Sequence, residues 1–120
     1  PYADKALLLR EAIANDTVRA LVPPLWLYEV GNTVTRRFPD QADRWLAALQ
    51  KFELDEYPQS SQWLTTAIAL TRQYSVAFYD ASYHAIAINE RGTFITADER
   101  YVRRITDSSA VIFISDWTSP

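Results

Sequence analysis

Two aspartates, Asp80 and Asp98, flank a stretch of the chain in which a helical pattern gives way to a strand pattern. Residues 81–90 have the apolar spacing of a helix, Gly92 is a suitable stop for it, and residues 93–96 form an apolar strand. Asp80 then begins the helix, and Asp98 lies just past the carboxyl end of the strand. Ligands bind at that edge of open parallel sheets. Two carboxylates directed at one edge repel each other unless a cation lies between them, so the pair predicts a divalent metal site.

Glu29 is a candidate third acid. It lies in a predicted helix over residues 25–37 whose first turns are otherwise apolar, and Asn32 follows on the same helix face. Each acid also has a purely structural interpretation, which is the better one when that acid is considered alone. Glu29 suits an ordinary, partly exposed helix position, and Asp80 and Asp98 suit helix N-caps. His84, one turn beyond Asp80, is predicted to be a surface or core-rim residue instead of a ligand or base.

The three acids share a position relative to candidate strands, which favours a common role. Each follows an apolar segment, and these segments end at Val22, Phe78 and Thr96. A cluster of carboxylates at the carboxyl edge of a sheet suits a hard divalent ion such as Mg²⁺ or Mn²⁺. Such an ion activates water and neutralises a phosphate during displacement. The sequence has no Walker loop, nucleophile elbow or dinucleotide fingerprint that would indicate a different chemistry.

Helices and strands alternate along the chain, and this order must position the acids. Further helices are predicted over residues 3–15, 39–52 and 62–74, the last capped by Ser60 or Ser61, and a short arginine-rich helix follows Asp98. Further strands are predicted over residues 19–22, 52–57 and 110–115. The alternation predicts an α/β fold with a central parallel sheet and helices on both of its faces.

Length and composition restrict the class of protein. The 120 residues predict one domain, and the high apolar content of 48% predicts a folded chain. Without cysteine and with one histidine, a metal would have to be held by oxygen atoms. A net charge of −3 argues against nucleic-acid binding through bulk phosphate neutralisation, although bound metal ions reverse the local charge. No apolar run is long enough for a membrane helix, and a cytoplasmic protein is expected.

Three motifs, in order, resemble those of PIN-domain proteins, and within that family they are most similar to the VapC-type toxins of toxin–antitoxin pairs. They are Pro-Pro-Leu-Trp-Leu-Tyr-Glu29-Val-Gly-Asn32, Tyr79-Asp80-Ala-Ser-Tyr83-His-Ala-Ile-Ala and Phe-Ile-Thr96-Ala-Asp98. The acids are separated by 51 and 18 residues, which suits the order of acids in that family. The resemblance covers essentially the whole chain, as a single PIN-like domain over residues 1–120.

The resemblance implies a metal-dependent endoribonuclease that uses Mg²⁺ or Mn²⁺ to hydrolyse RNA phosphodiesters with activated water. It implies that Glu29, Asp80 and Asp98 are the catalytic metal ligands. Asn32 and Thr96 would support the site, and Asp116 would be an additional acid. Such proteins dimerise and are held inactive by a small VapB-type antitoxin.

In one respect the chain departs from the family pattern. Family members carry another catalytic aspartate on a first strand, which here would lie upstream of Pro1. The chain also contains no methionine. We therefore expect the domain, as written, to lack its N-terminal strand, and a chain that truly lacks it would bind metal and cleave RNA weakly.

Two alternatives to the nuclease remain open. A catalytically inactive PIN-like domain could serve as a binding or assembly module, which the acidic net charge and the absent first strand both suggest. A receiver-like or flavodoxin-like α/β domain is the weaker alternative because it would place its acids differently. Metal binding separates the nuclease from the inactive module, which needs no metal site.

Overall fold

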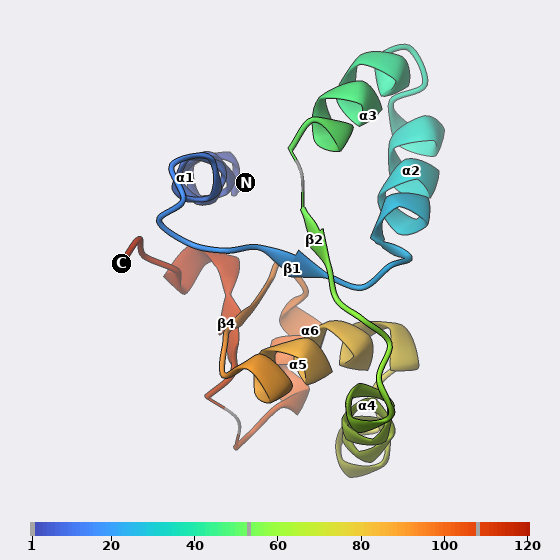
Figure 1. The fold of residues 1–120 in the computed structure, drawn as a ribbon, viewed down its shortest axis with the longest axis vertical. Helices are drawn as coiled ribbons and strands as arrows, with labels where there is room; N and C mark the ends of the chain where they lie inside the picture. The colour runs from blue at the N-terminus through green and yellow to red at the C-terminus, as the bar shows by residue number, and fades with distance from the viewer. Residues whose placement is uncertain (1, 53, 108) are drawn as a thin grey trace. The chain divides into compact units, whose positions relative to one another are not determined.

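The computed structural model describes residues 2–52, 54–107 and 109–120, and its ribbon is drawn in Figure 1. The chain divides into two compact units. The larger unit contains Pro1–Arg19 and Gln59–Pro120, and the smaller unit contains Ala20–Pro58. Each unit has its own helices and its own pair of strands, so each is described separately.

The smaller unit is a pair of helices between two short strands (Figure 1). Its elements are β1 (Leu21–Val22), α2 (Trp26–Arg37), α3 (Ala42–Gln50) and β2 (Asp55–Glu56). The two strands are parallel, with Leu21 opposite Asp55. The Trp26 indole N–H donates to a Glu56 carboxylate oxygen at 3.2 Å, which ties the start of α2 to β2. Helices α2 and α3 pack together, with the rings of Phe38 and Trp45 4.9 Å apart.

The larger unit carries the second pair of strands and most of the helices (Figure 1). Its elements are α1 (Ala3–Ala14), α4 (Ser61–Tyr74), α5 (Phe78–Glu90), β3 (Phe94–Thr96), α6 (Glu99–Arg104), β4 (Val111–Phe113) and the 3₁₀-helix η1 (Ile114–Asp116). Strands β3 and β4 are parallel, with Phe94 opposite Val111 and Thr96 opposite Phe113. Helix α1 packs on η1, where the Lys5 ammonium donates to the Trp117 carbonyl at 2.7 Å.

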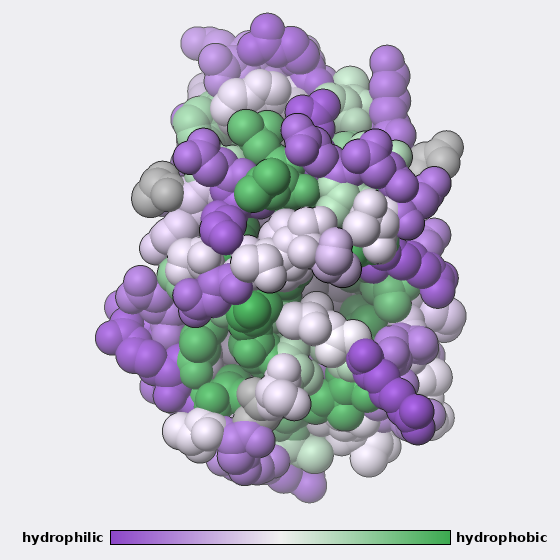
Figure 2. Space-filling model, turned by 90° about the vertical axis from the view of Figure 1, so that its left-hand side faces the viewer, coloured by the Kyte–Doolittle hydropathy of each residue, from purple (hydrophilic) through white to green (hydrophobic). Residues whose placement is uncertain are grey.

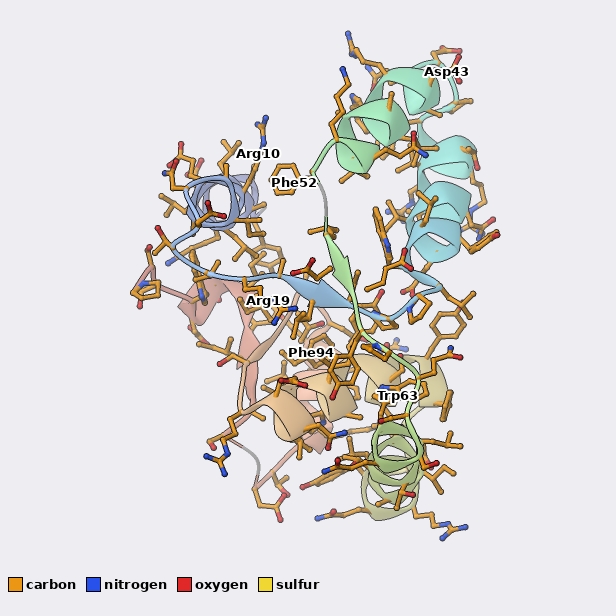
Figure 3. All side chains as sticks on the ribbon, viewed as in Figure 1. Arg10, Arg19, Asp43, Phe52, Trp63 and Phe94 are labelled. Atoms are coloured by element: carbon orange, nitrogen blue, oxygen red, sulfur yellow. The ribbon has the colours of Figure 1, made fainter. Side chains whose placement is uncertain are left out.

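The core of the larger unit lies between α4 and α5, which make its most extensive packing. Three alanines in this contact, Ala67, Ala81 and Ala85, are completely buried. Small side chains let the two helix backbones approach closely. Trp63 of α4 is buried beside them, and its indole N–H donates to the Ser82 carbonyl of α5 at 3.0 Å (Figure 3). The packing therefore fixes the first turns of α5, which carry Asp80.

Local sequence explains the start of α4, whereas the end of α5 differs from the prediction. The Ser60 hydroxyl accepts from the Trp63 N–H and caps α4, as predicted. The predicted stop at Gly92 is wrong in detail. Arg91 adopts the left-handed conformation that ends α5, with φ 55°, and the Gly92 N–H donates to the Ala87 carbonyl at 2.8 Å. A non-glycine residue in this conformation costs roughly 1–2 kcal/mol, which the packing of α5 must offset.

The predicted α/β fold class and the parallel pairing of its strands are confirmed. Among the described residues, however, the strands form two separate two-stranded sheets, so one central sheet with helices on both faces stays a prediction, as does a single domain. The predicted strand edge before Asp80 is wrong, because residues 75–77 form only a short connection and α5 already begins at Phe78. Part of the strand predicted over residues 52–57 falls on Glu53, outside the described residues.

Several large apolar side chains remain at the surface. Figure 2 shows, on one face, apolar side chains that reach the surface between hydrophilic ones. In the larger unit the exposed large apolar residues include Leu7, Leu64, Phe78 and Tyr79. Within the described part of the chain, no helix has the length and apolar character needed to cross a membrane.

Candidate functional site

Asp98 is held firmly at the carboxyl end of β3. Its carboxylate accepts from the backbone N–H groups of Arg100, at 3.0 Å, and Tyr101, at 3.2 Å, and so caps α6. Its own N–H donates to the Thr96 hydroxyl at 3.1 Å. The interpretation of Asp98 as a helix N-cap is confirmed. A capping carboxylate keeps free lone pairs, so the cap orients Asp98 without using all of its capacity to bind a ligand.

Asp80 lies in the first turn of α5, within electrostatic range of Asp98. The N-cap of α5 is Ala77, so the interpretation of Asp80 as an N-cap is wrong. Burial raises the pKa of the Asp80 carboxyl above its ordinary value, and the negative charge of Asp98 raises it further. The structure thus brings these two acids, hereafter the acid pair, close enough to repel each other. A cation at this position would relieve both the burial cost and the repulsion.

A buried histidine and tyrosine lie beside the acid pair. His84 of α5 is completely buried, so its predicted place at the surface or core rim is wrong. Its Nδ1 lies 2.7 Å from the Tyr101 hydroxyl. Burial raises the pKa of Tyr101, and the charge of Asp80 raises it further, whereas burial lowers the pKa of His84. These directions keep the phenol protonated and the imidazole neutral, and the Tyr101 hydroxyl and His84 Nδ1 share a hydrogen bond.

Tyr101 is a residue of this site that sequence reasoning missed. Its backbone N–H binds Asp98, its hydroxyl binds His84, and its pKa responds to Asp80. The available signal was its position three residues after the capping Asp98, which places its N–H within reach of the capping carboxylate. Its ring also packs edge-on against Phe94 of β3, with centroids 5.6 Å apart. Tyr101 therefore links β3, α5 and α6 beneath the acid pair.

The buried histidine predicts a pH dependence of stability. His84 is the only histidine in the chain, and its folded pKa lies below the ordinary 6.5. The unfolded chain therefore binds a proton at a pH where the folded chain does not, and stability is lost as the pH falls from about 6.5 through the folded pKa. We expect the melting temperature to fall between about pH 7 and pH 5, and to fall less in His84→Gln. Thermal unfolding across this range measures both, and parallel curves for the two proteins would contradict the prediction.

The other predicted site residues, Glu29, Asn32 and Asp116, lie on elements other than α5 and β3. Glu29 is exposed in the first turn of α2, and Asn32 is exposed one turn later. Both belong to the smaller unit, so their convergence with the acid pair stays a prediction. Asp116 ends η1 directly after β4, and because β3 and β4 are parallel neighbours, Asp98 and Asp116 follow the same edge of that sheet.

The donor atoms around the acid pair fit a hard divalent ion. The two carboxylates and the Thr96 hydroxyl are oxygen donors, and His84 is already engaged by Tyr101. Mg²⁺ and Mn²⁺ prefer such oxygen donors and are commonly held by only one or two carboxylates. Over residues 2–52, 54–107 and 109–120, no group of three or more histidine or acidic side chains is arranged to hold a metal ion. Within the described residues the structure therefore shows a pair of acids, not a triad.

Comparison with known proteins gives the family. The sequence matches the model of the PIN domain over residues 2–107. Searches of curated proteins and of solved structures gave no match. Because the matched region spans most of the chain and contains Asp80 and Asp98, this chain belongs to the PIN domain family.

Proposed function

We propose that this chain is a metal-dependent endoribonuclease of the VapC type that hydrolyses RNA phosphodiesters. PIN domains are generally metal-dependent nucleases, so family membership supports a nuclease function. The observation that supports the proposal most directly is that Asp80, in the first turn of α5, lies within electrostatic range of Asp98, directly after β3, so that burial and the charge of Asp98 together raise the pKa of Asp80. A carboxyl whose pKa is raised by burial and by a specific charged neighbour is a candidate functional group.

In this proposal Glu29, Asp80 and Asp98 are the metal ligands, and Asn32 and Thr96 support them. When bound there, Mg²⁺ or Mn²⁺ supplies an activated water and a positive charge beside the phosphate. Residues of the chain fix the orientation of Asp98 before an ion binds. The N–H groups of α6 and the hydroxyl of Thr96 orient Asp98. Because a supported carboxylate needs little reorganisation when its ligand arrives, this orientation favours catalysis.

The finer biological role is part of the same proposal. The three motifs around Glu29, Asp80 and Asp98 resemble those of VapC-type toxins, which supports a cytoplasmic toxin that a VapB-type antitoxin holds inactive. A homodimer is proposed on the same basis. The alternative is an inactive PIN-like module that binds or assembles without catalysis; it does not cleave RNA, and it needs no metal site.

Metal binding and metal removal test the proposal. We expect Mn²⁺ at about 100 times its Kd to raise the free energy of unfolding by about 2.7 kcal/mol, because the ion binds only the folded acid pair. We also expect a chelator to abolish RNA cleavage and added Mn²⁺ to restore it. Thermal unfolding and gel analysis of a labelled RNA measure the two effects.

A variant outside the acid pair serves as the control for this test. Asp116→Asn removes one exposed carboxylate near the same sheet edge and should keep the Mn²⁺ shift. A shift without cleavage would favour the inactive module. If the full chain shows no Mn²⁺ shift and no metal-dependent cleavage, the proposed nuclease is refuted.

A further inference from the structure

Tyr101 contacts α5 through its side chain and Asp98 through its backbone. Its hydroxyl lies 2.7 Å from Nδ1 of His84 on α5, and its backbone N–H donates to the Asp98 carboxylate at 3.2 Å. His84 follows Asp80 by four residues on α5, so these two side chains lie on the same face of that helix. The contacts of Tyr101 therefore run from the helix that carries Asp80 to the carboxylate of Asp98.

Burial restricts the geometry of the hydrogen bond between Tyr101 and His84. Tyr101 is 3% exposed and His84 is completely buried. The two rings also meet edge to face, with centroids 5.7 Å apart, and the Tyr101 ring packs edge-on against Phe94 of β3. A buried ring held by neighbours on two other elements has few alternative positions. The Tyr101 hydroxyl is therefore kept within hydrogen-bonding distance of His84.

A second contact joins the same face of α6 to the segment before α5. The Arg104 guanidinium donates to the Ser75 carbonyl at 2.6 Å, and Arg104 follows Tyr101 by three residues on α6. Both Arg104 and Ser75 are exposed. Because a hydrogen bond is stronger where water is excluded, we expect the buried contact of Tyr101 to do more to hold α6 against α5.

We propose that Tyr101 is a positioning residue, whose hydrogen bond to His84 holds α6 against α5 and so presents the carboxylates of Asp98 and Asp80 to the same metal ion. This inference rests on the proposed function and adds to it a residue that acts through the ligands without binding the ion. Asp98 and Asp80 lie within electrostatic range of each other. Because two like charges repel, contacts between the elements that carry them must oppose their separation.

Calorimetric titration of the full chain with Mn²⁺ measures how well the two acids are presented. We expect Tyr101→Phe, which keeps the ring and removes the hydroxyl, to raise the Kd for Mn²⁺ by about 10-fold to 100-fold, as is typical when a group that orients metal ligands is lost. Thr66→Val is the matched control. It removes a hydrogen bond between α4 and α5, in which Thr66 Oγ1 lies 3.1 Å from Asn89 Oδ1, at the end of α5 away from Asp80. It should leave the Kd unchanged even if its melting temperature falls as far as that of Tyr101→Phe.

Amide hydrogen exchange without metal is a second measurement. The backbone N–H groups of Arg100 and Tyr101 donate to the Asp98 carboxylate, so their exchange rates report whether that carboxylate stays in place. We expect both amides to exchange about 2-fold to 10-fold faster in Tyr101→Phe than in the wild type, and at the wild-type rate in Thr66→Val. If Tyr101→Phe folds poorly, the double variant Tyr101→Phe/His84→Leu replaces both polar partners by apolar groups and should regain stability without regaining the Mn²⁺ affinity.

The outcomes separate the positioning role from the nuclease. Faster exchange at residues 100 and 101 in Tyr101→Phe, in a protein that neither binds Mn²⁺ nor cleaves RNA, would support the positioning contact and remove the enzyme. Wild-type Mn²⁺ affinity and wild-type exchange in Tyr101→Phe would overturn the positioning role and leave the enzyme in place. An equal loss of Mn²⁺ affinity in Thr66→Val would also overturn the positioning role, because the loss would then follow stability alone.

Discussion

We expect Asp80→Asn and Asp98→Asn each to reduce metal-dependent RNA cleavage by at least about 100-fold, because each replaces a charged ligand of the proposed metal ion by a neutral amide. The structure supports testing these two positions together. Burial and the charge of Asp98 raise the pKa of Asp80, so the two carboxylates lie within electrostatic range of each other. Initial rates on a labelled RNA at saturating Mn²⁺ measure the loss.

The same two variants should leave the fold intact, which separates catalysis from stability. Asn at position 98 can still cap α6, because Asn is as good an N-cap as Asp. Asn at position 80 removes a carboxylate whose charged form is disfavoured by burial and by Asp98, so without metal its melting temperature should equal or exceed that of the wild type. For Asp80 the folded pKa lies above the unfolded one, so the advantage of Asp80→Asn appears as the pH rises through the folded pKa and vanishes at lower pH.

A control and a cellular assay complete the comparison. Asp116→Asn should retain most of the activity, because Asp116 is exposed on η1 and the charge that raises the pKa of Asp80 is that of Asp98. If the chain is a toxin, its expression slows bacterial growth and expression of Asp80→Asn does not. Wild-type cleavage rates in Asp80→Asn would refute the assigned site whatever the growth assay shows.

Trp63→Ala has the largest expected effect on stability, a loss of about 3–5 kcal/mol. Trp63 is 7% exposed, donates a buried hydrogen bond to the Ser82 carbonyl and supports the Phe78 ring. Truncation to alanine leaves a cavity between α4 and α5 and removes this hydrogen bond. Because natural domains are stable by only about 5–15 kcal/mol, this single change removes a large share of the total. Denaturant unfolding measures it.

Two further substitutions separate the causes of this loss. Trp63→Phe keeps an aromatic ring but removes the donor and part of the buried volume, so it should lose less than Trp63→Ala, roughly 1–3 kcal/mol. The adjacent Leu64, which is 44% exposed on α4, is the control, and Leu64→Ala should cost less than about 1 kcal/mol. Equal losses for Trp63→Ala and Leu64→Ala would show that Trp63 does not anchor the packing of α4 against α5.

Much of the local structure could be predicted from the sequence. The helices over residues 3–14, 26–37 and 61–74, the cap at Ser60, and the place of Asp98 just after β3 all follow from apolar periodicity and from capping chemistry. These features depend on residues within a few positions of one another along the chain. The parallel pairing of strands followed from the alternation of helices and strands, which requires crossover connections.

Other features depend on contacts between residues far apart in sequence, and only the tertiary structure decided them. Periodicity suggested a strand before Asp80, but packing against α4 extends α5 back to Phe78 and places Asp80 in a helical turn. It also suggested a surface histidine, whereas α5 buries His84 against Tyr101. The sequence by itself therefore determined which residue types follow each strand and cap each helix. The raised pKa of Asp80 and the hydrogen bond between His84 and Tyr101 depend on burial and on the proximity of residues far apart in sequence. Both exist only once α5, β3 and α6 pack together.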